Sequence, residues 1–545
     1  MKRLKINEKF LLTLVTGVAA VLFGILYWNS RVPMEEPQPI QMSSLENWDI
    51  AVSDANGKGL HENKGIYEQD SNIYDVYISV FPTKDADGKM LDLSAFDLHV
   101  ARDHSYNPIL NCNIQIVEEG KKPDPLLDLD HKNATIRVRG NSSRGETYKS
   151  YKVKLEEEAG DFFGQKNLNI NKHANDISKI STKLQTDLLT QIDHIASYRT
   201  YFMRLWIRDV SLPEEEQEFK YYGLYTETEQ PNKTYLEARS LASNASMYKA
   251  SDFSFAMNDV LRNVDDPAYS EEEFETVLAI REGTDHGKLL EMLEAVNDTA
   301  RDFGDIFQTY FNEDNYLTWL AFNLLMGNED IINHNFIIYN PDNSLTWYFI
   351  PWDFDGALRF GEHRSIFSQP DSLRGIQTLN TGILHRRYFR MTGSIEKLDD
   401  KMRELLDTVI TERNVTQLIN SYKPVLEKTM PLYPDIDRLE MSPDELNTYL
   451  DGIYSGILEN YEAVHKALEY PAPMFVAAPE RSADGSVHFA WEVSYSYQGR
   501  PVTYTIRLYE DPYRQNLIFE QTDIEQTEFD YKGRLADGTY YLQVT

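Results

Sequence analysis

The spacing of apolar residues changes twice along this chain of 545 residues, and that order restricts the fold more than any other feature. Up to residue 172, short runs alternate apolar and polar residues, which is typical of antiparallel strands; residues 96–101 are one such run. From residue 175 to residue 470 helical spacing dominates, interrupted by strand-like runs. Beyond Pro473 only strand patterns return. The sequence therefore predicts an α+β fold that ends in a C-terminal β-sandwich.

The N-terminus predicts a membrane anchor. Residues 1–9 contain four basic side chains and one acid, and residues 10–28 contain no charge. At about 1.5 Å per residue, a helix over residues 10–28 is long enough to cross a bilayer. We expect residues 1–9 to be a cytoplasmic flank and the globular domains to lie outside the cytoplasm, in a single-pass membrane protein. A cleaved signal peptide is the alternative, although no A-x-A-like site follows Trp28.

Composition divides the remainder into four regions. Proline-rich residues 29–62 resemble a stalk, residues 63–130 a β-rich region and residues 131–470 a central domain. Residues 473–545, after the run Tyr470-Pro-Ala-Pro, form the predicted sandwich.

The overall charge limits the partners of the chain. The net charge is −33, so the surface repels phosphates and we expect no nucleic-acid partner. A single cysteine, Cys112, excludes an intrachain disulfide.

A basic segment stands out against this acidic background. Between Lys132 and Lys154 there are seven basic residues and one acid, on two predicted strands and the turn that joins them. Strand parity places Arg137 with Arg139, and Lys152 with Lys154, on the face opposite the apolar residues. This face is either a solvated outer surface or a site for phosphate oxygens.

Acidic and amide side chains suited to Mg²⁺ occur further along. Asp330 and Asn335 have the spacing D-x-x-x-x-N at the end of an apolar helix. FIIYN and the aromatic run LTWYFIPWDFD then predict a hairpin with Pro341-Asp342-Asn343 at the turn, and Asp353 and Asp355 follow in PWDFDG at the end of its second strand. Carboxylate and amide oxygens make a hard site suited to Mg²⁺. The same spacing occurs in the catalytic loop of protein kinases, so the pattern favours phosphoryl transfer. Asp330 as a helix cap and Asp353 as a turn residue are the structural alternatives.

Five sequence runs resemble the spore coat protein H (CotH) kinase family, an atypical protein-kinase-like group. They are IRVRGNSSRG…YKSYKVKL, GLYTETEQPNKTYL, MYKASD, GNEDIINHNFIIYN and YFIPWDFDGAL. The resemblance implies that residues 131–470 form a kinase-like domain. A membrane anchor before that domain and a fibronectin-III-like module after it, here residues 473–545, are also similar to many exported relatives.

The resemblance also implies a reaction, the Mg²⁺-dependent transfer of the γ-phosphoryl group of ATP to protein hydroxyls. Asp330 would be the catalytic aspartate. Asn335, Asp353 and Asp355 would be metal ligands. The nucleotide-binding residues would be Arg139, Lys149, Lys152, Lys154 and Glu229, with Glu229 paired to a lysine that the sequence does not identify.

Two other functions compete with this interpretation. The chain could be a catalytically inactive cell-surface scaffold or adhesin, although the retained Asp330, Asn335 and Asp353 count against that. It could also transfer a nucleotidyl group on the same fold, which the sequence does not distinguish from phosphorylation.

Overall fold

The computed structural model describes residues 60–67, 73–123, 131–173, 175–361, 375–533 and 535–545. Their contacts divide them into two units, one that ends at His465 and one that begins at Lys466. The expected cytoplasmic flank, the expected transmembrane helix and nearly all of the expected stalk lie outside the described residues.

The membrane localisation expected from the sequence is contradicted. Within the described ranges, no helix is both long enough and apolar enough to span a bilayer. The expected transmembrane segment, residues 10–28, lies outside those ranges. We therefore withdraw the prediction of a single-pass membrane protein.

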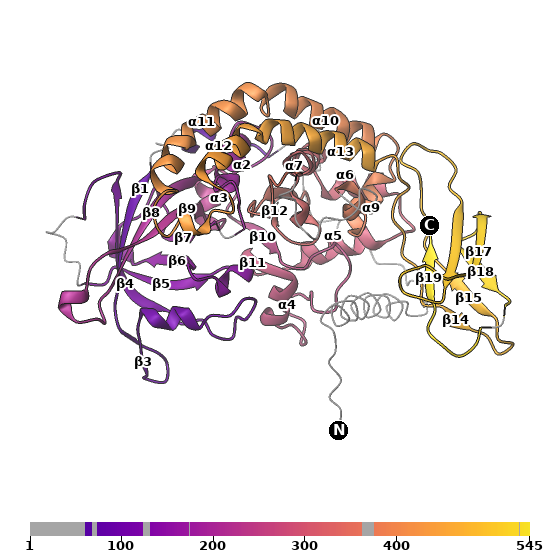
Figure 1. Cartoon of the computed structure of the whole chain (residues 1–545), viewed down its shortest axis with the longest axis horizontal. Coiled ribbons are helices and arrows are strands. Elements are labelled where there is room, and N and C mark those ends of the chain that lie inside the picture. Colours follow the sequence, from indigo (N-terminus) through magenta and orange to yellow (C-terminus); the bar gives the residue numbers. More distant parts are fainter. Residues whose placement is uncertain (1–59, 68–72, 124–130, 174, 362–374, 534) are drawn as a thin grey trace. The chain divides into compact units, whose positions relative to one another are not determined.

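The first unit begins with a closed β-barrel (Figure 1). Its strand order is β1-β4-β5-β6-β7-β9-β8, with antiparallel neighbours except for β1 and β8, which are parallel. Strands β1 and β4, from the region expected to precede the kinase-like domain, pair within the same barrel as β5. The barrel strands are β1 (Tyr74–Val80), β4 (Leu110–Glu118), β5 (Ala134–Arg139), β6 (Ser150–Leu155), β7 (Asn167–Asn171), β8 (Thr200–Asp209) and β9 (Lys220–Glu229).

Alternation along β5 and β6 separates the barrel core from its outer face. Ile136, Val138 and Val153 are buried in the core, whereas the basic side chains between them are half-buried or exposed. This confirms the predicted parity, because successive side chains of a strand point to opposite faces.

One predicted strand is wrong. Residues 93–98 form a 3₁₀ helix, where an alternating run had predicted a strand over residues 96–101. The Asp92 carboxylate accepts a hydrogen bond from the backbone N–H of Ser94 and so caps the helix start. A short aspartate side chain of this kind competes with strand pairing for the backbone donors. The remaining short strands of this segment are β2 (Thr83–Lys84) and β3 (Met90–Leu91).

A second sheet follows the barrel, with strand order β11-β10-β12-β13. It contains the predicted hairpin, formed by β12 and β13. Its strands are β10 (Ala245–Ala250), β11 (Leu278–Glu282), β12 (Phe336–Pro341) and β13 (Tyr348–Pro351).

The helix α7 (Glu313–Met326) leads the chain to this hairpin and is buried along almost its whole length. The Asn312 side chain accepts a hydrogen bond from the N–H of Asn315 at its start, and Gly327 ends it in a left-handed conformation, φ 65°. A Cβ at Gly327 would come within 2.7 Å of Asn460, so no other residue fits there without a shift.

The remaining helices of this unit lie beside the barrel and the second sheet (Figure 1). They are α2 (Ser181–Leu189), α3 (Lys233–Ala238), α4 (Glu271–Val277), α5 (Gly287–Asn297), α6 (Phe303–Tyr310), α8 (Ile376–Leu379), α9 (Ile383–Phe389), α10 (Ser394–Thr408), α11 (Glu412–Thr429), α12 (Pro443–Asp451) and α13 (Ile453–Ala467).

The second unit contains two three-stranded sheets, β14-β15-β18 and β17-β16-β19. Trp491 and Phe489 pack with Ile506 and Leu508 in one apolar cluster. The mixed α+β class is thus confirmed, and C-terminal sheets are present. These strands are β14 (Glu480–Arg481), β15 (Val487–Ala490), β16 (Tyr504–Tyr509), β17 (Leu517–Ile524), β18 (Glu528–Tyr531) and β19 (Tyr541–Val544).

Candidate active site

The β12–β13 hairpin brings two predicted metal ligands to one edge of the second sheet. Phe336, the first residue of β12, pairs with Pro351, the last residue of β13. Asn335 and Asp353 flank this pair along the chain, so both lie at the same end of the hairpin. Both have a left-handed backbone, with φ of 61° and 60°. Such strain in residues other than glycine is common where a site fixes the direction of a side chain.

Asp330 lies beside Asn335. The Asn335 Nδ2 is 3.4 Å from Asp330 Oδ2, and the His334 Nε2 is 3.4 Å from Asp330 Oδ1. The hydrogen bond with His334 lowers the pKa of Asp330, which keeps the carboxylate ionised although burial opposes this. The side chain is 55% exposed, so it can reach an incoming group. The helix start here is capped by Asn328, which leaves the Asp330 carboxylate out of the cap.

Asp355 completes the acidic side of the site. The neighbouring Phe354 is fully buried and its carbonyl accepts a hydrogen bond from Ser181, which fixes this segment. The Asn175 Nδ2 donates to Asp355 Oδ2 at 3.1 Å. Burial and, after it, the charges of Asp353, Asp176 and Asp330 together raise the pKa of Asp355 to about 7, although the hydrogen bond from Asn175 opposes the shift. Negative charge therefore accumulates here.

The acidic groups do not form a metal site by themselves. Among the residues that the structure describes, no three acidic, histidine or cysteine side chains are grouped closely enough to hold a metal ion.

Basic side chains from both sheets face these carboxylates. On the barrel, Arg137 pairs directly with Lys152 across β5 and β6. Like charges directly opposite one another are destabilising, so this pair favours a bound anion. Burial and, after it, the charges of Arg137, Arg139, Arg281 and Lys154 together lower the pKa of Lys152 to about 8.

Lys249 in β10 links the basic and acidic groups. Burial lowers the pKa of Lys249, and the negative charges of Asp353 and Asp355 oppose this shift. Burial also lowers the pKa of Arg139, again opposed by Asp353. Asp353 therefore acts electrostatically on a cation of each sheet.

Two of these cations were missed from the sequence. Lys249 falls within MYKASD, one of the runs that carry the family resemblance, and that run was the available signal. Arg281 lies in β11, and none of the sequence runs that resemble the family includes it. Lys154, which was predicted, is exposed and lies on the same face of β6 as Lys152.

The structure does not bring Lys149 to this group. Its Nζ is buried and donates a hydrogen bond to the Arg144 carbonyl at 2.8 Å. Arg144 in turn donates to the carbonyls of Asp103 and Tyr106. Lys149 thus supports the turn between β5 and β6, a correction to its expected place among the nucleotide-binding residues.

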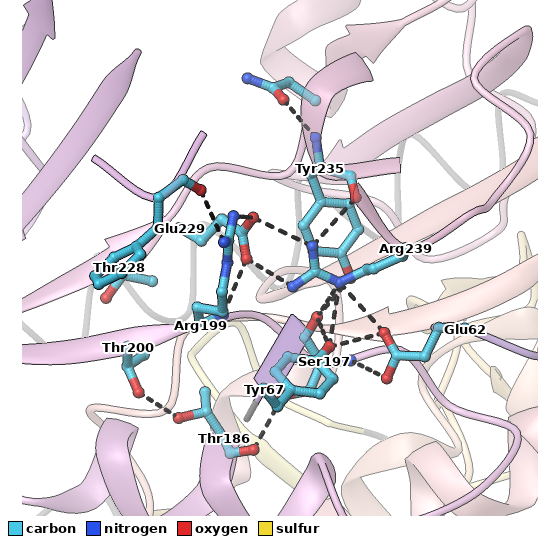
Figure 2. A network of polar contacts seen from close by, with 12 residues as sticks. Glu62, Tyr67, Thr186, Ser197, Arg199, Thr200, Thr228, Glu229, Tyr235 and Arg239 are labelled. Atoms are coloured by element: carbon cyan, nitrogen blue, oxygen red, sulfur yellow. Dashed lines mark hydrogen bonds and ion pairs between the residues drawn. The ribbon is translucent and has the colours of Figure 1, made fainter. Parts of the chain in front are cut away.

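Glu229 pairs with arginines, which corrects the expected lysine–glutamate pair. Figure 2 shows its carboxylate between Arg199 and Arg239, with an N–O distance of 2.6 Å to each. The Arg239 Nε also lies 3.2 Å from Glu62, and its guanidinium stacks 3.7 Å from the Tyr235 ring centroid. Although burial opposes the shift, the two arginines lower the pKa of Glu229 to about 2. The network ties residues 60–67 to the end of β9.

Removing Arg239 is expected to destabilise this unit strongly. Arg239→Ala leaves Glu62 and Glu229 buried with fewer partners, and breaking a buried ion pair in this way costs about 3–5 kcal/mol. Chemical denaturation followed by circular dichroism measures the loss. The matched control is Arg262→Ala, which removes an exposed pair with Asp266 and should cost less than about 1 kcal/mol. Equal losses in the two variants would contradict a stabilising role for the network.

A sheet edge that sets basic side chains opposite carboxylates is the arrangement of kinase-like proteins, which bind a metal-bound nucleotide phosphate between such groups. The sequence comparisons agree with this class. The sequence model of the family described as CotH kinase protein matches residues 136–457, and the chain belongs to this family.

The individual proteins that match this chain have low sequence identity to it. The inner spore coat protein H of Bacillus subtilis (strain 168) is 25% identical over 337 residues, which cover 59% of this chain and 84% of that protein. Among solved structures, the Helicobacter pylori proinflammatory kinase CtkA has a TM-score of 0.27 and 9% identity, over 61% of this chain and 93% of that chain. The Shewanella oneidensis MR-1 HipA, HipB and operator DNA complex has a TM-score of 0.25 and 11% identity, over 55% of this chain and 59% of that chain. TM-scores of this size do not establish a shared fold.

Proposed function

We propose that the chain is a kinase that transfers the γ-phosphoryl group of ATP to protein hydroxyls in a Mg²⁺-dependent reaction. The observation that carries the proposal is the grouping of these charged side chains. Asp330 lies within hydrogen-bond distance of Asn335, at the end of the hairpin that also carries Asp353, and the charge of Asp353 acts on the cations Arg139 and Lys249. A kinase needs a base, metal-binding carboxylates and phosphate-binding cations close together.

Each group has a role that follows from its surroundings. Asp330, ionised and half-exposed, accepts the proton of the acceptor hydroxyl. Arg139, Lys249 and Lys152 hold phosphate oxygens, because their positive charges are concentrated in a partly buried region. Positioning and charge neutralisation of this kind account for most of the catalysis of phosphoryl transfer.

The acidic side chains fit Mg²⁺ held jointly with the nucleotide. Asp353, Asp355 and Asn335 would hold the metal. Mg²⁺ is usually bound by one or two protein carboxylates together with substrate phosphates, so the small number of grouped acids is compatible with this metal. Bound there, Mg²⁺ would supply positive charge to the β- and γ-phosphates.

Binding of MgATP by the purified chain tests the proposal. Isothermal titration calorimetry should detect ATP binding in the presence of Mg²⁺ and much weaker binding with EDTA. The absence of any nucleotide binding would instead favour a non-enzymatic scaffold.

We further propose that residues 473–545 form a fibronectin-III-like β-sandwich that takes no part in catalysis. The chemistry-bearing groups named above all precede residue 356, and the apolar cluster around Trp491 belongs to the C-terminal sheets alone.

A chain that ends at Tyr470 is therefore expected to keep the transfer activity of the full chain. The cut is placed there because Ala472 already donates a backbone hydrogen bond to Tyr495 of the C-terminal unit. Transfer activity is compared by measuring the initial rate of ADP formation for the full chain and for the shortened chain. A folded shortened chain without activity would show that the C-terminal sheets help to build the site or to present the substrate.

A further inference from the structure

Arg281 lies at an irregularity of the sheet beside the candidate site. Strand β11 is the edge strand next to β10. Tyr248 pairs with Ile280 and Met247 pairs with Glu282, so the register shifts and Arg281 is the extra residue between them. A β-bulge of this kind turns a side chain away from its regular direction, and bulges are common next to active sites.

Arg281 acts electrostatically on cations of both sheets. Its charge contributes to lowering the pKa of Lys152, of Arg139 and of Lys249, which come from β6, β5 and β10. Burial lowers the pKa of Arg281 itself, opposed in part by the charge of Glu275. This one guanidinium of the second sheet therefore makes three other cations less stable in the positively charged form.

The guanidinium also has an unused donor. The Nε of Arg281 is buried and has no hydrogen-bond partner among the described residues. By contrast, the Nε of Arg204 lies 2.7 Å from Asp75 and the Nε of Arg239 lies 3.2 Å from Glu62. An unpaired buried donor within a group of cations indicates a missing anionic partner.

We propose that Arg281 is a phosphate-binding residue of the nucleotide site and completes it from the second sheet, opposite the cations of β5 and β6. Its ligand is the polyphosphate chain, because the planar guanidinium donates two parallel hydrogen bonds to phosphate oxygens. The inference rests on the proposed function and adds a residue that joins both sheets to one ligand.

Thermal unfolding of the full chain with sodium tripolyphosphate, at matched ionic strength and without metal, tests this role. Tripolyphosphate should stabilise the wild type. Arg281→Gln should unfold at a temperature equal to or about 1–2 °C above the wild type when no ligand is present, because repulsion is relieved. It should also lose most of the stabilisation by tripolyphosphate, and its affinity for MgATP should fall at least about tenfold.

Two further variants separate a binding role from a structural one. Arg281→Lys keeps the charge and should retain part of the stabilisation. Arg262→Gln, in the exposed pair with Asp266, should respond to tripolyphosphate like the wild type.

Four results would overturn the inference. Full stabilisation of Arg281→Gln by tripolyphosphate would show that Arg281 does not bind phosphate. A clear fall in its unfolding temperature without ligand would make it a structural residue. If the wild type binds MgATP and Arg281→Gln binds it equally well, the inference fails while the proposed function stands. If the wild type binds neither ligand, both fail.

Discussion

Replacing Asp353 with asparagine is expected to remove Mg²⁺-dependent ATP binding and to reduce phosphoryl transfer by about a thousandfold. The substitution takes away the carboxylate that faces Arg139 and Lys249. Folding should be little affected, because Asp353 is exposed and asparagine tolerates its left-handed backbone. Calorimetry for binding, and the rate of ADP formation for transfer, measure the two effects.

The control for this variant is Asp342→Asn, an exposed aspartate at the turn of the same hairpin. It removes the same charge at the opposite end of β12 and β13 and should leave ATP binding and transfer unchanged. Undiminished activity in Asp353→Asn would contradict its assignment to the site. Equal losses in both variants would point to a general effect of charge.

Asp330→Asn is expected to separate transfer from binding. Loss of the general base should lower the transfer rate by about 10²–10⁴-fold. MgATP affinity should stay close to that of the wild type, because the base acts on the acceptor hydroxyl and not on the nucleotide. Asp330→Asn also keeps a polar side chain next to His334 and Asn335, so the local structure should persist.

This prediction is tested by measuring the dissociation constant of MgATP and the transfer rate for both Asp330→Asn and the wild type. A variant that transfers normally would remove Asp330 from the mechanism. A variant that unfolds or loses ATP binding would show that Asp330 supports the structure.

Local features of the fold could be predicted from the sequence. The alternation in β5 and β6 correctly placed Arg137, Arg139, Lys152 and Lys154 on the outer face, because strand parity depends only on neighbouring residues. The β12–β13 hairpin was predicted from its turn residues and aromatic strands. The strand predicted over residues 96–101 is wrong, because the Asp92 cap stabilises a 3₁₀ helix there and alternation does not reveal such a cap.

The site could be predicted only in part. Asp330 and Asn335 are five residues apart and meet through local geometry. Lys249 and Arg281 join the basic group through contacts between two sheets, which no local pattern encodes. Glu229 was expected to pair with a lysine, but its partners are Arg199, which precedes β8, and Arg239, which follows α3, and no local pattern encodes these contacts.

We expect this chain to split ATP at the γ-phosphate and to pass that group to a protein. The most direct measurement incubates the purified full chain and acceptor proteins with Mg²⁺ and ATP labelled at either the γ- or the α-phosphate. We expect label in protein from γ-labelled ATP alone, ADP as the nucleotide product, and neither in Asp353→Asn. Protein label from α-labelled ATP with release of pyrophosphate, or no turnover of ATP by the wild type, would contradict the account.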